Sequence, residues 1–256
     1  MPRQIINKEA TFSRRNLLTG AGKFVAGAAG IAMISTGGQG LLSDIAAKEI
    51  KNWPWGYKKI DPAKAAQIAY NKYYEGACCY GVVNGIIVPL QKEIGEPYTS
   101  LPLNAFRFGH SGVVGWGTTC GTLIGAGIAT GFIAGKPGEE ILNELINWYV
   151  KTSLPTFIPI TPKANIKNTS RSDSPLCHIS AGRWMKKEGV PFGSAVRAER
   201  CARLAANVSA KTVILLNEWA DGKLGRVQES QIKMYGMPAQ NNCTDCHEMN
   251  VPNVKK

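Results

Sequence analysis

The segment Cys243-Thr244-Asp245-Cys246-His247 restricts what this chain can fold into more than any other stretch of its sequence. Two thiols at this spacing can form thioether bonds with the two vinyl groups of one porphyrin, and the adjoining imidazole can bind its iron axially. We therefore expect Cys243 and Cys246 to hold a covalent haem, haem c, with His247 as the proximal ligand of the haem iron.

The same spacing of cysteines also occurs in zinc sites and in thioredoxin-like redox turns. A zinc site needs a second pair of ligands nearby, and the C-terminal tail contains no such pair. A thioredoxin-like turn lies between a strand and a helix of a βαβ unit, and the residues before 243 show no such pattern. The sequence therefore favours haem over a disulfide or a metal loop at this position.

A haem held by His247 needs a sixth iron ligand if it is to be low-spin. The chain has three histidines in all, so only His178 and His110 offer a second imidazole. We expect His178 to be the distal ligand and rank His110 second, with the methionines of the tail third. Either histidine could instead have a local role, His178 at a helix terminus and His110 in a loop beside a glycine.

The first 47 residues have the composition of an export signal. The paired Arg14 and Arg15 precede Lys23, and a Gly- and Ala-rich apolar run follows as far as Ile34, which predicts a twin-arginine signal. This run is shorter and less apolar than the roughly 20 residues that a membrane span needs, although a retained anchor is the alternative. We expect export to the periplasm and no stable membrane span after signal cleavage.

The net charge of the chain limits the classes of partner that it is expected to bind. The formal net charge is +12, and residues 1–47 contain five basic and two acidic residues, so that their removal leaves +9. A basic surface can serve nucleic acid, an anionic membrane face or an acidic redox partner. Because the chain is expected to be exported and has no dense basic run, we expect redox partner proteins and no nucleic acid.

Apolar residues recur at helical spacing over much of the chain, and no segment shows the sustained alternation of a strand. The fold class is therefore predicted to be mainly α, with a helical cysteine-rich domain over 48–222 and a loop-rich C-terminal haem-binding tail over 223–256. Residues 151–175, which are rich in Pro, Ser and Thr, are predicted to form a long polar connection. The predicted helices cover about 61–74, 76–94, 117–135, 137–149, 178–188 and 194–219.

Five further cysteines lie before the tail: Cys78, Cys79, Cys120, Cys177 and Cys201. An odd number of thiols in an exported subunit cannot all form disulfides within that subunit. Four of them, all except Cys79, lie on or directly before different predicted helices, and thiolates converging from four helices could hold an iron-sulfur cluster. Spacing alone also allows buried free cysteines that pack as small hydrophobic residues.

The order of these cysteines resembles a family of redox-associated proteins named for its pattern C, GCAxxG, C, C. Cys78, the segment GTTCGTLIG at 117–125, Cys177 and Cys201 carry the resemblance, and the added haem motif makes the chain similar to the split-Soret type of cytochrome c. The resemblance implies a helical cluster domain and a homodimer. In that dimer the haems lie parallel and nearly in contact, and the partner subunit donates an axial histidine.

The chain departs from this pattern in two respects. Split-Soret proteins carry two haems per subunit, whereas this sequence has one attachment motif, so we expect one haem per subunit and a haem pair only across the dimer. Cys79 lies where the family pattern needs no ligand, so we expect it to be a packing residue or a spare thiol.

Together these features predict a periplasmic electron-transfer c-type cytochrome with one covalent haem and an iron-sulfur centre. The sequence shows no nucleophile with a base, no phosphate-binding loop and no pair of poised carboxylates, which favours an electron carrier over an enzyme. One alternative is a haem-dependent redox enzyme acting on a small molecule. Another is a thiol-redox or structural protein without iron.

Overall fold

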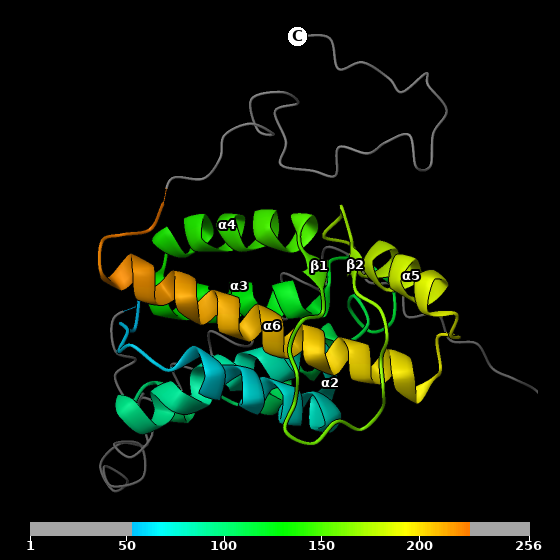
Figure 1. Cartoon of the computed structure of the whole chain (residues 1–256). Helices are drawn as coiled ribbons and strands as arrows, with labels where there is room; N and C mark the ends of the chain where they lie inside the picture. The colour runs from blue at the N-terminus through cyan, green and yellow to red at the C-terminus, as the bar shows by residue number, and fades with distance from the viewer. Residues whose placement is uncertain (1–52, 226–256) are drawn as a thin grey trace, which may run out of the picture. The chain divides into compact units, whose positions relative to one another are not determined.

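The computed structural model describes residues 53–225, which form five α-helices, two short 3-10 helices and one small antiparallel pair of strands (Figure 1). This architecture confirms the predicted mainly α fold class. The signal region 1–47 and the haem motif with Cys243, Cys246 and His247 lie outside the described residues. The elements in chain order are α2 (Pro62–Glu93), η1 (Tyr98–Ser100), η2 (Leu103–Gly109), α3 (Gly121–Ala134), α4 (Pro137–Lys151), β1 (Ser153–Leu154), β2 (Ser170–Arg171), α5 (Cys177–Glu188) and α6 (Ala195–Ala220).

The element α2 consists of two helices joined by a sharp turn, as the sequence predicts. Asp61 caps its start by accepting a hydrogen bond from the Ala63 backbone N–H, and the helical backbone is interrupted at Gly76 and Ala77. The second half returns along the first, and Gly85 packs so closely that a side chain there would lie 2.7 Å from the Ala65 carbonyl oxygen. Pro89 lies inside the second half, so the break is at the turn and not at the proline.

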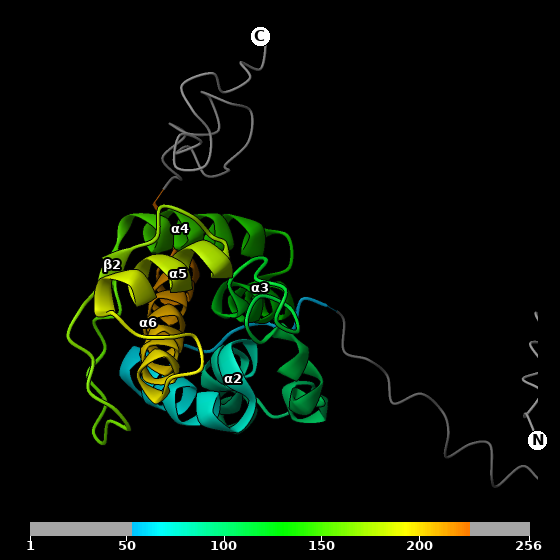
Figure 2. The ribbon, with the colours of Figure 1, turned by 90° about the vertical axis from the view of Figure 1, so that its right-hand side faces the viewer.

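The long helix α6 runs through the centre of the described fold. Viewed from the side, α2 lies on one side of α6 and α4 on the other, while α3 packs against all three (Figure 2). The core between them consists of aliphatic and aromatic side chains that are almost fully buried, among them Ile86, Leu123, Leu145 and Leu204. Among residues 53–225, no helix has the length and apolarity required to span a bilayer.

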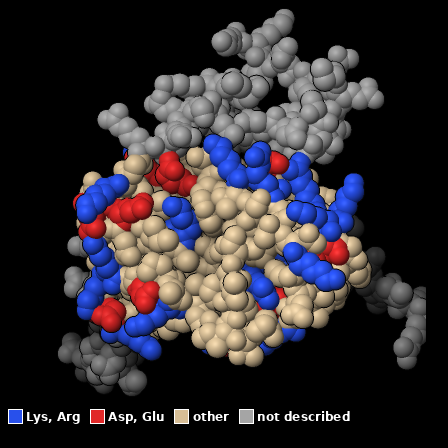
Figure 3. Space-filling view, in the orientation of Figure 1, with Lys and Arg blue, Asp and Glu red and all other residues tan. Residues whose placement is uncertain are grey.

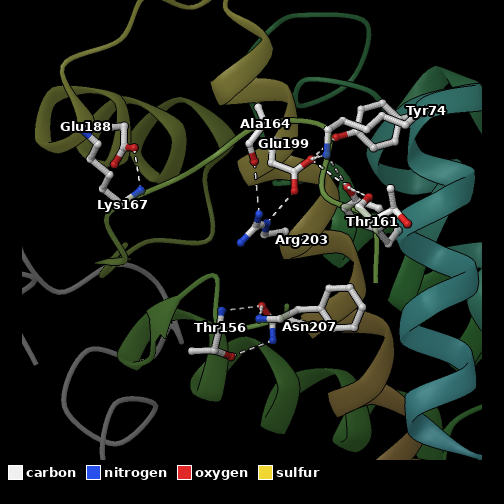
Figure 4. Close-up of polar contacts among 12 residues, drawn as sticks. Tyr74, Thr156, Thr161, Ala164, Lys167, Glu188, Glu199, Arg203 and Asn207 are labelled. Atoms are coloured by element: carbon white, nitrogen blue, oxygen red, sulfur yellow. Dashed lines mark hydrogen bonds and ion pairs between the residues drawn. The ribbon is translucent and has the colours of Figure 1, made fainter. Parts of the chain in front are cut away.

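The predicted polar connection after α4 is fixed to α6 by a buried carboxylate (Figure 4). Glu199 accepts hydrogen bonds from the Tyr70 hydroxyl (2.8 Å), from the Tyr74 hydroxyl and from the Lys163 backbone N–H (3.2 Å), and it pairs with Arg203 Nε at 2.6 Å. Burial alone would raise the pKa of Glu199, but these hydrogen bonds and the arginine outweigh burial and lower it. The carboxylate therefore anchors the connection in its charged form.

The predicted start of a helix near Gly117 is wrong, because α3 begins at Gly121. The residues before it follow a left-handed path instead, with positive φ at each of the five residues 111–115, including 58° at Val113 and 44° at Val114. A β-branched residue rarely adopts this conformation, which is costly for L-amino acids. Gly117 also has a positive φ of 72°, so it cannot form the first turn of a right-handed helix.

Candidate metal centre

Three of the predicted cluster cysteines lie at the N-terminal ends of helices. Cys78 follows the turn inside α2, Cys120 is the N-cap residue of α3, and Cys177 is the first residue of α5. Cys201 lies in the second turn of α6. Because a helix N-terminus carries free N–H groups and a partial positive charge, it favours thiolates and other anions.

A short backbone pairing brings the starts of α3 and α5 together. Thr119 and Leu176 form an antiparallel bridge, the Cys120 N–H donates to the Pro175 carbonyl oxygen at 2.8 Å, and the Cys177 N–H donates to the Thr118 carbonyl oxygen at 2.6 Å. The two cysteines are therefore positioned by hydrogen bonds between loops that are more than 50 residues apart in the chain.

Close packing at Gly121 brings α3 to Cys78. A Cβ atom at this position would overlap the Gly109 carbonyl oxygen and would lie 2.9 Å from the Cys78 Cβ. Only glycine permits this approach, which explains why a glycine directly follows Cys120. The loop before α3 also contributes, because the Ser111 backbone N–H donates a hydrogen bond to Cys78.

We name Cys78, Cys120, Cys177 and Cys201 the cysteine cluster, because the charge on each of these thiols influences the pKa of another. Burial raises the pKa of the Cys78 thiol, and the nearby Cys201, Cys120 and Cys177 raise it further. Burial likewise raises the pKa of Cys177 to about 12, with contributions from Cys120 and Cys201. The four thiols therefore lie within electrostatic range of one another. Within residues 53–225, no three Cys, His, Asp or Glu side chains stand at metal-binding spacing.

Cys79 does not join the cysteine cluster. Its side chain is fully buried, and burial alone raises the pKa of its thiol to about 12, with no contribution from another cysteine. It packs against Gly109, where an added Cβ would overlap the Cys79 side chain, and α3 contacts its backbone at Gly125. This environment agrees with the expectation that Cys79 is a packing residue.

Polar side chains that the sequence analysis did not single out surround the cysteine cluster. Burial and the nearby Cys120 raise the pKa of the Tyr149 hydroxyl, which donates to Ser180 Oγ at 2.7 Å. Arg200 lies next to Cys201 in sequence and places its Nη1 3.9 Å from the Cys201 sulfur. No local signal in the sequence marks Arg200, because it lies among other charged residues near the start of α6.

The two candidate distal histidines lie on the side of the fold that carries the cysteine cluster. His178 follows Cys177 in α5, its side chain is exposed, and its backbone N–H donates to the Gly117 carbonyl oxygen at 3.1 Å. His110 is half-buried at the end of η2 and lines a shallow pocket of about 410 Å³ with residues of α2, including Tyr73. The exposure of His178 leaves its imidazole free to meet a ligand from solvent.

Apolar side chains are exposed around these histidines. Trp116 is 82% exposed and Val114 is 57% exposed in the left-handed loop, and Phe108 and Leu176 are partly exposed beside it. Single exposed apolar residues need no explanation, but a group of this kind is typical of a surface that contacts another apolar group. The cysteine cluster thus lies beneath a loop whose outer side is apolar.

The chain is similar to known redox proteins. The model of the redox-active protein family C_GCAxxG_C_C matches residues 77–215. The split-Soret cytochrome c of Desulfovibrio desulfuricans is 31% identical over 245 residues, which cover 91% of this chain and 86% of that protein. A solved structure, described as a novel iron centre in the split-Soret cytochrome c from that species, shares 30% identity with a TM-score of 0.65 and covers 78% of this chain and 86% of that one.

The fold and its gathered cysteines define a helical redox-active protein. The chain belongs to the C_GCAxxG_C_C family and, within it, to the family of the split-Soret cytochromes c. The resemblance expected from the sequence is confirmed.

Proposed function

We propose that this chain is an exported electron carrier that holds one haem c in its tail and an iron-sulfur centre at the cysteine cluster. The observation that carries the proposal is the convergence of four thiols, three of them at helix N-termini, in a chain that also contains a Cys-x-x-Cys-His motif. Its relative is by name a cytochrome c, and the solved structure of that protein is described as containing a novel iron centre.

The residues of the cysteine cluster fit an iron-sulfur centre in their chemistry. All four donors are sulfur atoms, and thiolates are the usual protein ligands of such centres. Three helix N-termini and the Ser111 N–H direct positive charge toward the sulfurs, and this charge opposes the effect of burial, which raises the pKa of Cys78 and Cys177. When bound, such a centre supplies one-electron redox chemistry. Three of the four cysteines are buried and Cys177 is half-buried.

The proposed haem site combines the tail motif with a histidine of the helical domain. The 21 residues from 226 to 246 could span up to roughly 70 Å if extended. Chain length therefore does not prevent His247 from approaching His178. The exposed Trp116 and Val114 offer an apolar surface beside His178 that suits the face of a porphyrin. We propose one haem per subunit, with a haem pair formed across a homodimer.

Export by the twin-arginine route suits this combination of cofactors. That route carries folded proteins, so a cluster can be inserted in the cytoplasm, whereas c-type haem is attached outside the membrane. A haem motif on a loop-rich tail is compatible with both steps. On the face drawn in Figure 3, Lys and Arg side chains lie in groups around the rim, which favours an acidic redox partner in the periplasm.

The test of the proposed function is the ratio of total iron to haem in the mature protein purified from its own host. Haem is quantified as the pyridine haemochrome and total iron by elemental analysis. We expect a ratio clearly above one, because the cysteine cluster adds non-haem iron. A ratio of one would remove the iron-sulfur centre, and a colourless protein would remove the haem.

Replacing His178 with alanine is expected to convert the haem iron from low-spin to high-spin, because the sixth ligand is lost. The absorption spectrum of the oxidised protein reports this change directly. The matched control is His110→Ala, which removes the other available imidazole. A low-spin spectrum in His178→Ala together with a high-spin spectrum in His110→Ala would assign the ligand to His110 instead.

A further inference from the structure

A buried arginine beside the cysteine cluster has no carboxylate partner. Arg200 is only 2% exposed, and its Nη2 donates to the Ser180 hydroxyl oxygen at 2.8 Å and to the Ser180 carbonyl oxygen at 3.2 Å. Its Nε, also buried, has no hydrogen-bond partner, and its Nη1 faces the Cys201 sulfur at 3.9 Å. Within residues 53–225, no ion pair joins Arg200 to an acidic side chain.

The nearest acidic residue in sequence cannot serve as the partner. Glu199 precedes Arg200 on α6, but its carboxylate is directed to Tyr70, Tyr74 and Arg203 on another side of the helix (Figure 4). A buried cation without a compensating charge is strongly destabilising, since proteins have little net stability to offset it. An anion is therefore required on the Cys201 side of the guanidinium.

Hydrogen bonds join Arg200 to Tyr149 through Ser180. The Tyr149 hydroxyl, whose pKa is raised by burial and by the nearby Cys120, donates to Ser180 Oγ, and the same oxygen accepts from Arg200, whose Nη1 faces Cys201. These hydrogen bonds hold the guanidinium in one orientation, and Trp184 packs with its ring centroid 6.0 Å from the guanidinium carbon. Arg200 is thus positioned toward the cysteine cluster and not toward solvent.

We propose that Arg200 is the buried counter-charge of the iron centre and raises its reduction potential. This inference rests on the proposed function, because thiolate-ligated iron is the anion that the cysteine cluster would present. If the cysteine cluster held such a centre, one electron from ferrous haem would reduce it, which would leave ferric haem and one more negative charge beside Arg200. The fixed guanidinium interacts more favourably with the reduced centre than with the oxidised one.

The experiment compares three variants of the full-length, haem-containing protein. Arg200→Met removes the charge, Arg200→Lys retains it, and Arg203→Met removes the neighbouring arginine that pairs with Glu199. The reduction potential of the non-haem centre is measured by redox titration followed by electron paramagnetic resonance. We expect Arg200→Met to lower the equilibrium constant for reduction at least tenfold, which is about 59 mV for one electron. Arg200→Lys should recover most of this loss, and Arg203→Met should leave the potential unchanged.

Thermal unfolding gives a second readout, which is expected to differ between the iron-free and the iron-loaded protein. In the protein without non-haem iron, Arg200→Met removes an uncompensated cation and should not lower the melting temperature. In the iron-loaded protein, the same change should lower the melting temperature. A residue with only a packing role would lower both melting temperatures. If Arg200→Met does not accumulate, Arg200→Gln removes the charge while keeping a donor for Ser180 and carries the same test.

The failures are distinguishable. An iron-to-haem ratio of one in the wild type overturns the proposed centre and the role of Arg200 together. Non-haem iron with an unchanged potential in Arg200→Met overturns the role of Arg200 alone. An equal shift of the reduction potential in Arg203→Met also overturns the role of Arg200, because the shift then does not require an arginine that faces the cysteine cluster.

Discussion

Replacing both Cys243 and Cys246 with alanine is expected to give a protein that has no covalently bound haem but retains non-haem iron. Each cysteine provides one thioether bond, so the double variant has no remaining attachment to either vinyl group. The cysteine cluster lies in helices that do not include the tail, and its ligands are unchanged. Haem content should fall to the detection limit of a haem stain after denaturing electrophoresis, while iron per protein falls by one.

The control for this variant is a second double variant, in which Cys79 and Cys201 are both replaced with alanine. These two cysteines have no place in a Cys-x-x-Cys-His motif, so the haem stain should persist when they are removed. A haem stain that survives the loss of Cys243 and Cys246 would contradict the assignment of the tail as the attachment site. A loss of haem in the first variant only would show that attachment is specific to the tail motif.

The helices could be predicted from the sequence because their signals are local. Asp61 and Pro62 mark the start of α2, and Gly76 marks the turn where the structure interrupts that element. Apolar residues at helical spacing predict α4 and α6, whose inward faces carry buried side chains such as Leu145 and Leu204. Fold class and helix positions follow from these short-range patterns.

The elements that complete the cysteine cluster depend on long-range contacts and could not be predicted in this way. The left-handed path at Val113 and Val114 opposes the intrinsic preference of β-branched residues, so the local sequence favours another conformation. The bridge between Thr119 and Leu176 joins two loops that carry no strand pattern. Both features are stable only because the surrounding fold holds them in place.

The buried charged residues of α6 could not be predicted from the local sequence either. Glu199 and Arg200 are adjacent and both are buried, yet they have separate partners on different sides of the helix. A residue of either type is normally exposed, so nothing in the local sequence marks these two side chains as buried. Their partners, Tyr70 and Ser180, come from α2 and α5, and only the tertiary structure identifies them.

Replacing Cys78 with alanine is expected to remove most of the non-haem iron while leaving one haem per subunit. The adjacent variant Cys79→Ala is the matched control, because both changes delete one sulfur atom from a buried side chain at neighbouring positions. Each deletion leaves a small cavity and should cost about 1 kcal/mol of the free energy of unfolding. Only Cys78→Ala deletes a thiol of the cysteine cluster, which also contains Cys120, Cys177 and Cys201.

The two variants should therefore differ in iron content and in the stability of the loaded protein, but not in haem content. In Cys78→Ala the free energy of binding iron no longer adds to the stability of the fold, so its melting temperature should fall further than that of Cys79→Ala. Elemental analysis, the pyridine haemochrome and thermal unfolding measure the three quantities on the same samples. Equal iron loss in both variants would indicate a general packing effect at the turn of α2, and full retention of iron in Cys78→Ala would exclude this thiol as a ligand.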